Sequence, residues 1–165
     1  MKRLVSILFL NLLSPGPLCS AQPIKEATAA PVVIKKTAKA ITPATYTGKQ
    51  VVVGNGGGFT GASTSYYLLE NGQLFGRRSH DTTFTFLAKQ TTTNTKRIFS
   101  KVENSCKIKK TRFDHPGNVY TFVQWRKGKT SYKVTWGATG KKAPSNYPKF
   151  YNSFMAMIPA SLRLK

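Results

Sequence analysis

The dipeptide Asn71-Gly72 is the sequence feature that most constrains the fold of this chain, because it separates two strand-like segments, residues 63–69 and 73–77. Asn-Gly is the dipeptide best suited to a two-residue turn in which both positions have positive φ, and such a turn joins antiparallel strands. The pattern therefore predicts a β-hairpin. A short β-branched strand is predicted before it, at residues 50–53.

A second hairpin is predicted in the C-terminal half, where residues 118–125 and 130–136 flank the turn sequence Arg126-Lys127-Gly128-Lys129. Polar and apolar residues alternate in its second strand, so one face of that strand is predicted to be buried, with Tyr132, Val134 and Trp136. The sequence Asp114-His115-Pro116-Gly117 before this hairpin predicts a turn.

Two other segments have the spacing of amphipathic helices. Residues 83–86 alternate Thr and Phe, which is typical of a strand or of the start of a helix, and a helix is predicted at residues 89–103. A last helix, with Ser145 as its N-cap and Pro159 at its end, is predicted from the spacing of Tyr147, Phe150, Tyr151, Phe154 and Ile158. Together the segments predict an α+β fold, an antiparallel β-sheet built from hairpins and packed against one or two helices.

The N-terminus has the pattern of an export signal. Lys2 and Arg3 precede the apolar residues 4–13, a run too short to span a bilayer as a stable helix. A signal peptide is therefore predicted at residues 1–21, with cleavage after Ala21. The protein is expected to be exported, to the periplasm or the extracellular space.

Cys19 offers a second route of processing, as the cysteine of a lipoprotein, but Leu18 stands where that signal requires a small residue. Residues 22–47 are rich in Ala, Thr, Pro and Lys and are predicted to form a flexible leader, with a short strand at residues 32–34 as the alternative. Residues 48–165 are predicted to form a single α+β domain, which we expect to be a monomer.

Charge is the strongest compositional signal. The chain has 26 Lys and Arg against 5 Asp and Glu, a formal net charge of +21, and most of the basic residues follow residue 76. Such a field attracts polyanions. The binding candidates are therefore the basic residues of two segments that also contain aromatic residues: Lys107, Lys109, Lys110, Arg112, Arg126, Lys127 and Lys129. We interpret the aromatic side chains of these segments as a buried face rather than as a platform for nucleic-acid bases.

The glycine cluster at residues 54–61 contains a match to the dinucleotide-binding fingerprint at Gly56, Gly58 and Gly61. That motif requires a helix to begin after it, because helix N-terminal amides hold the pyrophosphate. Here a strand is predicted to follow. The glycines are therefore interpreted as a structural turn, or as a loop that presents Phe59 to a partner, and Phe59 joins the binding candidates.

The sequence predicts neither catalysis nor a cofactor. Cys106, His115 and Asn118 occur in the order of a papain-like site, but His115 and Asn118 lie on one predicted turn and cannot orient each other from separate elements. His80 and His115, each beside an aspartate, lack the ligand spacing of a metal site. We therefore predict a protein that is not an enzyme, with no catalytic or metal-binding residue and with a buried Cys106.

Several motifs together resemble an uncharacterised family of small exported bacterial proteins: GNGGGFTG at residues 54–61, TSYYLLENGQLF at 64–75, HPGN at 115–118 and WG at 136–137. The Gly-Gly-Phe-x-Gly start at residues 57–61, leading into a Tyr-Leu strand, is also similar to emfourin-like domains, some of which inhibit thermolysin-type metalloproteases.

Two functions are therefore expected. The first is an exported, non-catalytic binding domain for an envelope protein or an anionic envelope component, with no specific nucleic-acid partner and no transmembrane segment. The alternative, implied by the second resemblance, is inhibition of a secreted metalloprotease.

Overall fold

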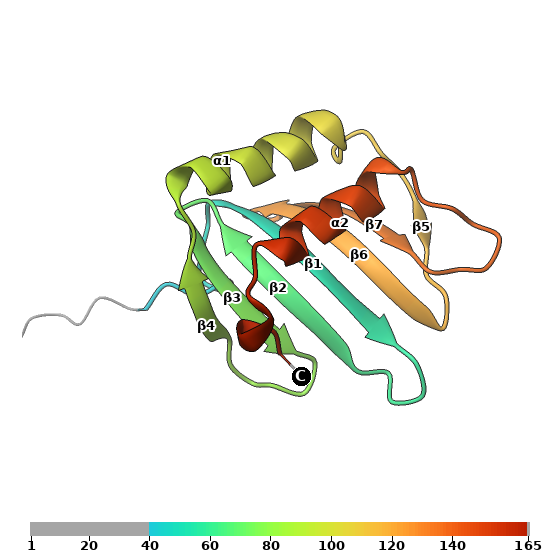
Figure 1. The fold of residues 1–165 in the computed structure, drawn as a ribbon, viewed down its shortest axis with the longest axis horizontal. Helices are drawn as coiled ribbons and strands as arrows, with labels where there is room; N and C mark the ends of the chain where they lie inside the picture. Colours follow the sequence, from blue (N-terminus) through green and yellow to red (C-terminus); the bar gives the residue numbers. More distant parts are fainter. Residues whose placement is uncertain (1–39, 165) are drawn as a thin grey trace, which may run out of the picture. The chain divides into compact units, whose positions relative to one another are not determined.

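Seven strands form one sheet in the order β4-β3-β2-β1-β6-β7-β5 (Figure 1). The strands are β1 Lys49–Gly57, β2 Ser63–Leu69, β3 Gln73–Arg78, β4 Thr85–Lys89, β5 Asp114–His115, β6 Val119–Lys127 and β7 Thr130–Trp136. Every neighbouring pair is antiparallel except β5 and β7, which run parallel. The computed structural model describes residues 40–164; the predicted signal peptide, Cys19, the strand at 32–34 and most of the leader lie outside them.

Helices cover one face of this sheet (Figure 1). Helix α1, Thr92–Ser100, continues into a π-helical turn, η1, at Lys101–Ser105, and α2 spans Asn146–Ala156 before a short 3-10 turn, η2, at Ala160–Leu162. The main core lies between helices and sheet, and among its fully buried members are Val51, Val53, Leu68, Ile98, Val123, Val134 and Phe154. The predicted α+β class is thus confirmed, with β5 making the sheet mixed.

The opposite face of the sheet carries a second apolar cluster, formed by Val52, Tyr67, Leu69, Phe75 and Phe122. Residues 42–46, the end of the predicted leader, contact this face, because the side-chain amide of Gln50 donates to the main-chain oxygens of Pro43 (3.0 Å) and Tyr46 (3.1 Å). Burial, together with the charge of Glu70, raises the pKa of the Tyr46 hydroxyl. Residues 50–54 of strand β1 are therefore buried on both faces of the sheet.

Both predicted hairpins are present, but the turn at Asn71-Gly72 differs from the two-residue turn expected there. Of the turn residues only Gly72 has a positive φ, 88°, and its N–H donates to the oxygen of Leu69 at 2.9 Å. Strand β2 ends at Leu69 and β3 begins at Gln73, so the loop has three residues, Glu70, Asn71 and Gly72. A type I turn followed by a glycine in the left-handed region suits this longer loop.

The predicted helix at 89–103 was wrong at both ends. Its first residue, Lys89, belongs to β4, and α1 begins at Thr92 because Thr91 caps it, with Oγ1 accepting from the N–H of Asn94 at 3.2 Å. At the other end, the N–H of Cys106 donates to the oxygen of Lys101, five residues earlier, which is the hydrogen bond of a π-helix.

Three smaller predictions also need correction. Asp114 and His115 form the strand β5 rather than a turn, because they pair with Thr135 and Trp136. Ser145 precedes α2, yet its side chain makes no capping hydrogen bond. Strand β1 also extends beyond the predicted residue 53, to Gly57.

Within residues 40–164, no helix is long and apolar enough to cross a membrane.

Candidate functional site

Three of the sequence motifs meet at one end of the sheet, which we call the glycine end: the loop 58–62 with residues 115–119 and 137. The N–H of Gly58 donates to the oxygen of Asn118 at 2.7 Å, and the N–H of Gly57 donates to the oxygen of Ala62 at 3.0 Å. Gly57 has φ 97°, and a Cβ at this position would overlap the oxygen of Asn118. The glycine cluster therefore brings the β1–β2 loop into backbone contact with the segment before β6.

The WG motif completes this end. A Cβ on Gly137, which has φ 152°, would overlap the oxygen of Val119, and the N–H of Ala138 donates to the oxygen of His115 at 3.0 Å. Glycine at 137 thus allows the end of β7 to pack backbone to backbone against the start of β6.

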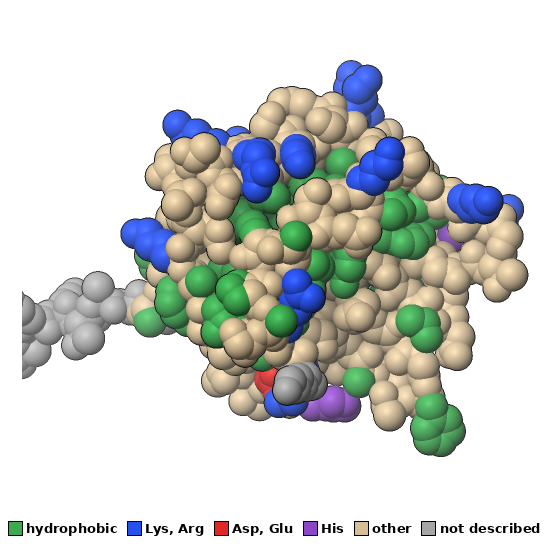
Figure 2. Space-filling model, in the orientation of Figure 1, with side chains coloured by type: hydrophobic (Ala, Val, Ile, Leu, Met, Phe, Trp, Pro, Cys, Tyr) green, Lys and Arg blue, Asp and Glu red, His purple; other side chains and the backbone are tan. Residues whose placement is uncertain are grey.

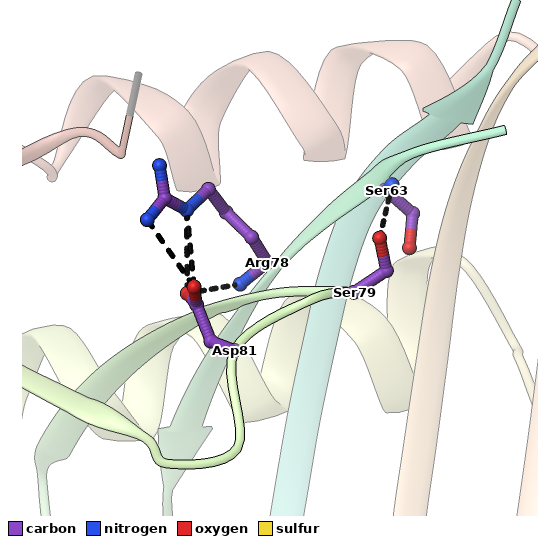
Figure 3. Close-up of polar contacts among 4 residues, drawn as sticks. All are labelled: Ser63, Arg78, Ser79 and Asp81. Atoms are coloured by element: carbon purple, nitrogen blue, oxygen red, sulfur yellow. Dashed lines mark hydrogen bonds and ion pairs between the residues drawn. The ribbon is translucent and has the colours of Figure 1, made fainter. Parts of the chain in front are cut away.

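The β3–β4 connection supports the loop from its other side (Figure 3). The N–H of Ser63 donates to Oγ of Ser79 at 3.1 Å, and the N–H of Ser79 donates back to the oxygen of Ser63 at 2.8 Å. The same connection is closed by Asp81, whose carboxylate accepts from the main-chain N–H of Arg78 (2.9 Å) and from its guanidinium (3.2 Å). These hydrogen bonds lower the pKa of the Asp81 carboxyl group, and the bond from the main-chain N–H has the largest effect.

Phe59 projects from this supported loop. Its relative exposure is 108%, and that of neighbouring Val119 is 62%. A loop whose two ends are fixed by hydrogen bonds loses little conformational entropy on binding, so an exposed aromatic side chain on it is well suited to act as an anchor.

We expect Phe59→Ala to change the free energy of unfolding by less than about 0.5 kcal/mol, because the side chain is fully exposed. Urea unfolding of the variant and the parent protein measures the difference. A loss of more than about 1.5 kcal/mol would show that the ring packs on the loop and has an architectural role.

The seven basic candidates lie at the other end of the sheet, which we call the basic end: Lys107, Lys109, Lys110, Arg112, Arg126, Lys127 and Lys129. Two contacts bring its two segments together. The Lys109 ammonium lies 4.5 Å from the centre of the Trp125 ring, and the Arg112 guanidinium lies 5.7 Å from that of Tyr132. Trp125 and Tyr132 are partners across β6 and β7. These cation–π contacts hold the 107–112 segment over the hairpin that carries the other basic residues.

Phe59 and the basic end do not form one surface. Strand β1 runs from Lys49, which pairs with Lys127, to Gly57, which pairs with Val119. At the usual strand rise these two pairs are about 27 Å apart. The predicted binding residues thus form two separate groups, one at each end of the sheet.

The aromatic residues of the basic end belong to the core. Trp125 is 4% exposed and Tyr132 packs against the main core, so neither ring face is free for a base. The lysines of both segments are exposed, and Figure 2 shows Lys and Arg side chains spread over the helix-covered face with few acidic ones. The arrangement favours attraction of a polyanion without base stacking.

Two adjoining hollows next to the basic end were missed by the sequence analysis. The first, of about 500 Å³, lies between the start of β1, the β2–β3 turn, the end of β4 and α1. The second, of about 400 Å³, is lined by Lys107, Lys109 and Lys110. Glu103 and Asn104, both in η1, line the two hollows and so form their boundary. No spacing signal links the residues of the first hollow, because they come from separate elements. The second hollow is lined by residues 103–110 alone, and its three lysines were already among the predicted candidates.

Glu103 organises this boundary electrostatically. Its Oε1 lies 3.8 Å from the ammonium nitrogen of Lys49 and 3.4 Å from that of Lys109, and Lys49 also lies 3.6 Å from Oε1 of Glu70. One carboxylate therefore holds a lysine on each side of it.

The residues considered for catalysis are placed apart. Cys106 is 3% exposed, and its Sγ lies 3.8 Å from the main-chain oxygen of Asn146. His115 lies on β5 and makes an edge-to-face contact with Phe113, with ring centres 4.7 Å apart. Among residues 40–164, no group of three or more His, Cys, Asp or Glu side chains is arranged to hold a metal ion.

Burial raises the pKa of the Cys106 thiol from 9.0 to about 11. We therefore expect its reaction with a thiol reagent at pH 8 to be at least about 100-fold slower than that of a free cysteine, because only the thiolate reacts. A Cys19→Ser protein isolates the signal of Cys106, and urea should restore the full rate. Rapid labelling of the folded protein would instead identify Cys106 as reactive.

Comparison with models of known protein families and with curated proteins finds no match to this chain. The resemblances described from its motifs therefore stay predictions.

Proposed function

We propose that the protein is an exported, non-catalytic binding domain that holds an anionic polymer of the cell envelope at its basic end. The observation that carries this proposal is the joining of the 107–112 segment to the β6–β7 hairpin by the contacts Lys109–Trp125 and Arg112–Tyr132. Two basic segments that are separate in sequence become one cationic surface, as expected for a polymer that contacts several cations at once.

Binding of heparin, used as a test polyanion, measures this property. If four lysines contact the polymer, its affinity should fall by about 50-fold when NaCl rises from 50 to 200 mM, because condensed counterions are released on binding. An affinity that is independent of salt would contradict an electrostatic surface.

A second function is favoured by Phe59, which stands fully exposed on a loop held at both ends by hydrogen bonds. Such a protruding aromatic tip suits insertion into the cleft of another protein, as the resemblance to emfourin-like inhibitors implies. Thermolysin activity in the presence of the purified protein tests this alternative. Inhibition that is tolerant of salt and lost in Phe59→Ala supports it, whereas unchanged thermolysin activity removes it.

A further inference from the structure

The lining of the first hollow combines groups of three kinds. Lys49, Lys89 and Lys96 supply positive charge, Glu70 and Glu103 supply carboxylate acceptors, and Asn71, Gln90 and Asn104 supply amides. Phe99, from α1, adds an apolar surface. Its volume of about 500 Å³ falls within the range of small-molecule sites.

This mixture discriminates between classes of anion. A phosphate chain carries only acceptor oxygens at neutral pH, so the carboxylates of Glu70 and Glu103 would repel it and could receive no hydrogen bond from it. A sugar acid carries hydroxyl groups that donate to carboxylates and amide oxygens, and a carboxylate that the lysines attract. The nonpolar C–H face of the sugar ring can also contact Phe99.

The second hollow extends the first. It shares Glu103 and Asn104 with the first hollow and adds Lys107, Lys109 and Lys110. The wide turn of η1 places both shared residues at the junction, and the side-chain amide of Asn104 is held by a hydrogen bond to Oγ of Ser100 at 3.1 Å. The two hollows therefore offer consecutive subsites along one path, each with cations beside a shared carboxylate.

We propose that the adjoining hollows at η1 bind an acidic polysaccharide, one sugar acid in the first hollow and the next part of the chain along the second. The proposal rests on the proposed function, since it names the polymer class that the basic end attracts and adds the site that recognises its sugar units.

The test compares two probes of equal charge by isothermal titration calorimetry: an oligogalacturonate, which has one carboxylate and free hydroxyls per unit, and a linear polyphosphate. The oligogalacturonate is expected to bind at least tenfold more tightly. The double variant Lys89→Gln/Lys96→Gln should weaken its binding by at least tenfold and that of polyphosphate by less than threefold, and Asn104→Ala should weaken the oligogalacturonate alone.

The matched control is Lys141→Gln/Lys142→Gln, which removes the same charge from exposed positions that line neither hollow. Thermal unfolding checks that each variant is folded. Equal affinity for the two probes, or equal effects of the two double variants, overturns the saccharide site and leaves a general polyanion surface in place. If neither probe binds, both proposals are overturned.

Discussion

Replacing Lys110, Lys127 and Lys129 together by glutamine is expected to weaken heparin binding by roughly 100-fold. All three side chains are exposed at the basic end and make no ion pair among the described residues. A cation near an anionic surface contributes about 1 kcal/mol, and three of them about 3 kcal/mol, which corresponds to about two powers of ten in affinity. Lys107 is left unchanged because it has a φ of 53°, so that a substitution there could alter the backbone conformation as well as the charge.

The matched control for this variant replaces Lys141, Lys142 and Lys149, which are equally exposed and lie outside the basic end, on the loop after β7 and on α2. It has the same net charge as the test variant but leaves the basic end intact, so it is expected to weaken binding by less than tenfold. Titration calorimetry at 50 mM NaCl measures both proteins. Equal losses would show that binding follows net charge alone and that the basic end has no special part in it.

Phe154→Ala is expected to lower the free energy of unfolding by about 3–5 kcal/mol. Phe154 is 0% exposed on the inner face of α2, with its ring centre 6.4 Å from that of Phe150. Removing the ring leaves a cavity between helix and sheet that the surrounding core can only partly fill. Because small domains are stable by only about 5–15 kcal/mol, the variant would lose a large share of its stability.

Urea unfolding followed by tryptophan fluorescence measures this loss. The control is Asn152→Ala, on the exposed face of the same helix, which should change the free energy by less than about 0.5 kcal/mol. A cost below about 1 kcal/mol for Phe154→Ala would mean that α2 does not pack on the sheet in solution.

The hairpins were predictable because their signals are local. Gly72 and Gly128 have positive φ in short turns between strand-like segments, and the residues that mark each turn are contiguous in the sequence. The apolar face of α2 was predictable for the same reason, since Tyr147, Phe150 and Phe154 repeat with the period of a helix and are all buried.

What the sequence could not predict depends on contacts between distant segments. The strand β5 exists only because Thr135 and Trp136 offer a partner to Asp114 and His115. The separation of Phe59 from the basic end follows from the length and pairing of β1. The first hollow at η1 joins residues from several elements. A π-helical turn has no distinctive sequence pattern, so its two boundary residues, Glu103 and Asn104, were not recognised as candidates.

The central position of β1 has a consequence for folding. One edge of β1 pairs with β2, which follows it directly in the sequence. The other edge pairs with β6, which is far away in the sequence, as the pairing of Val53 with Val123 shows. Until β6 is available, a chain that ends after α1 would expose the hydrogen-bonding groups along the Val51–Val53 run to any other molecule. Fragments that stop before residue 119 are therefore expected to self-associate, and nucleation should be slowed by the long loop that must close before the sheet is complete.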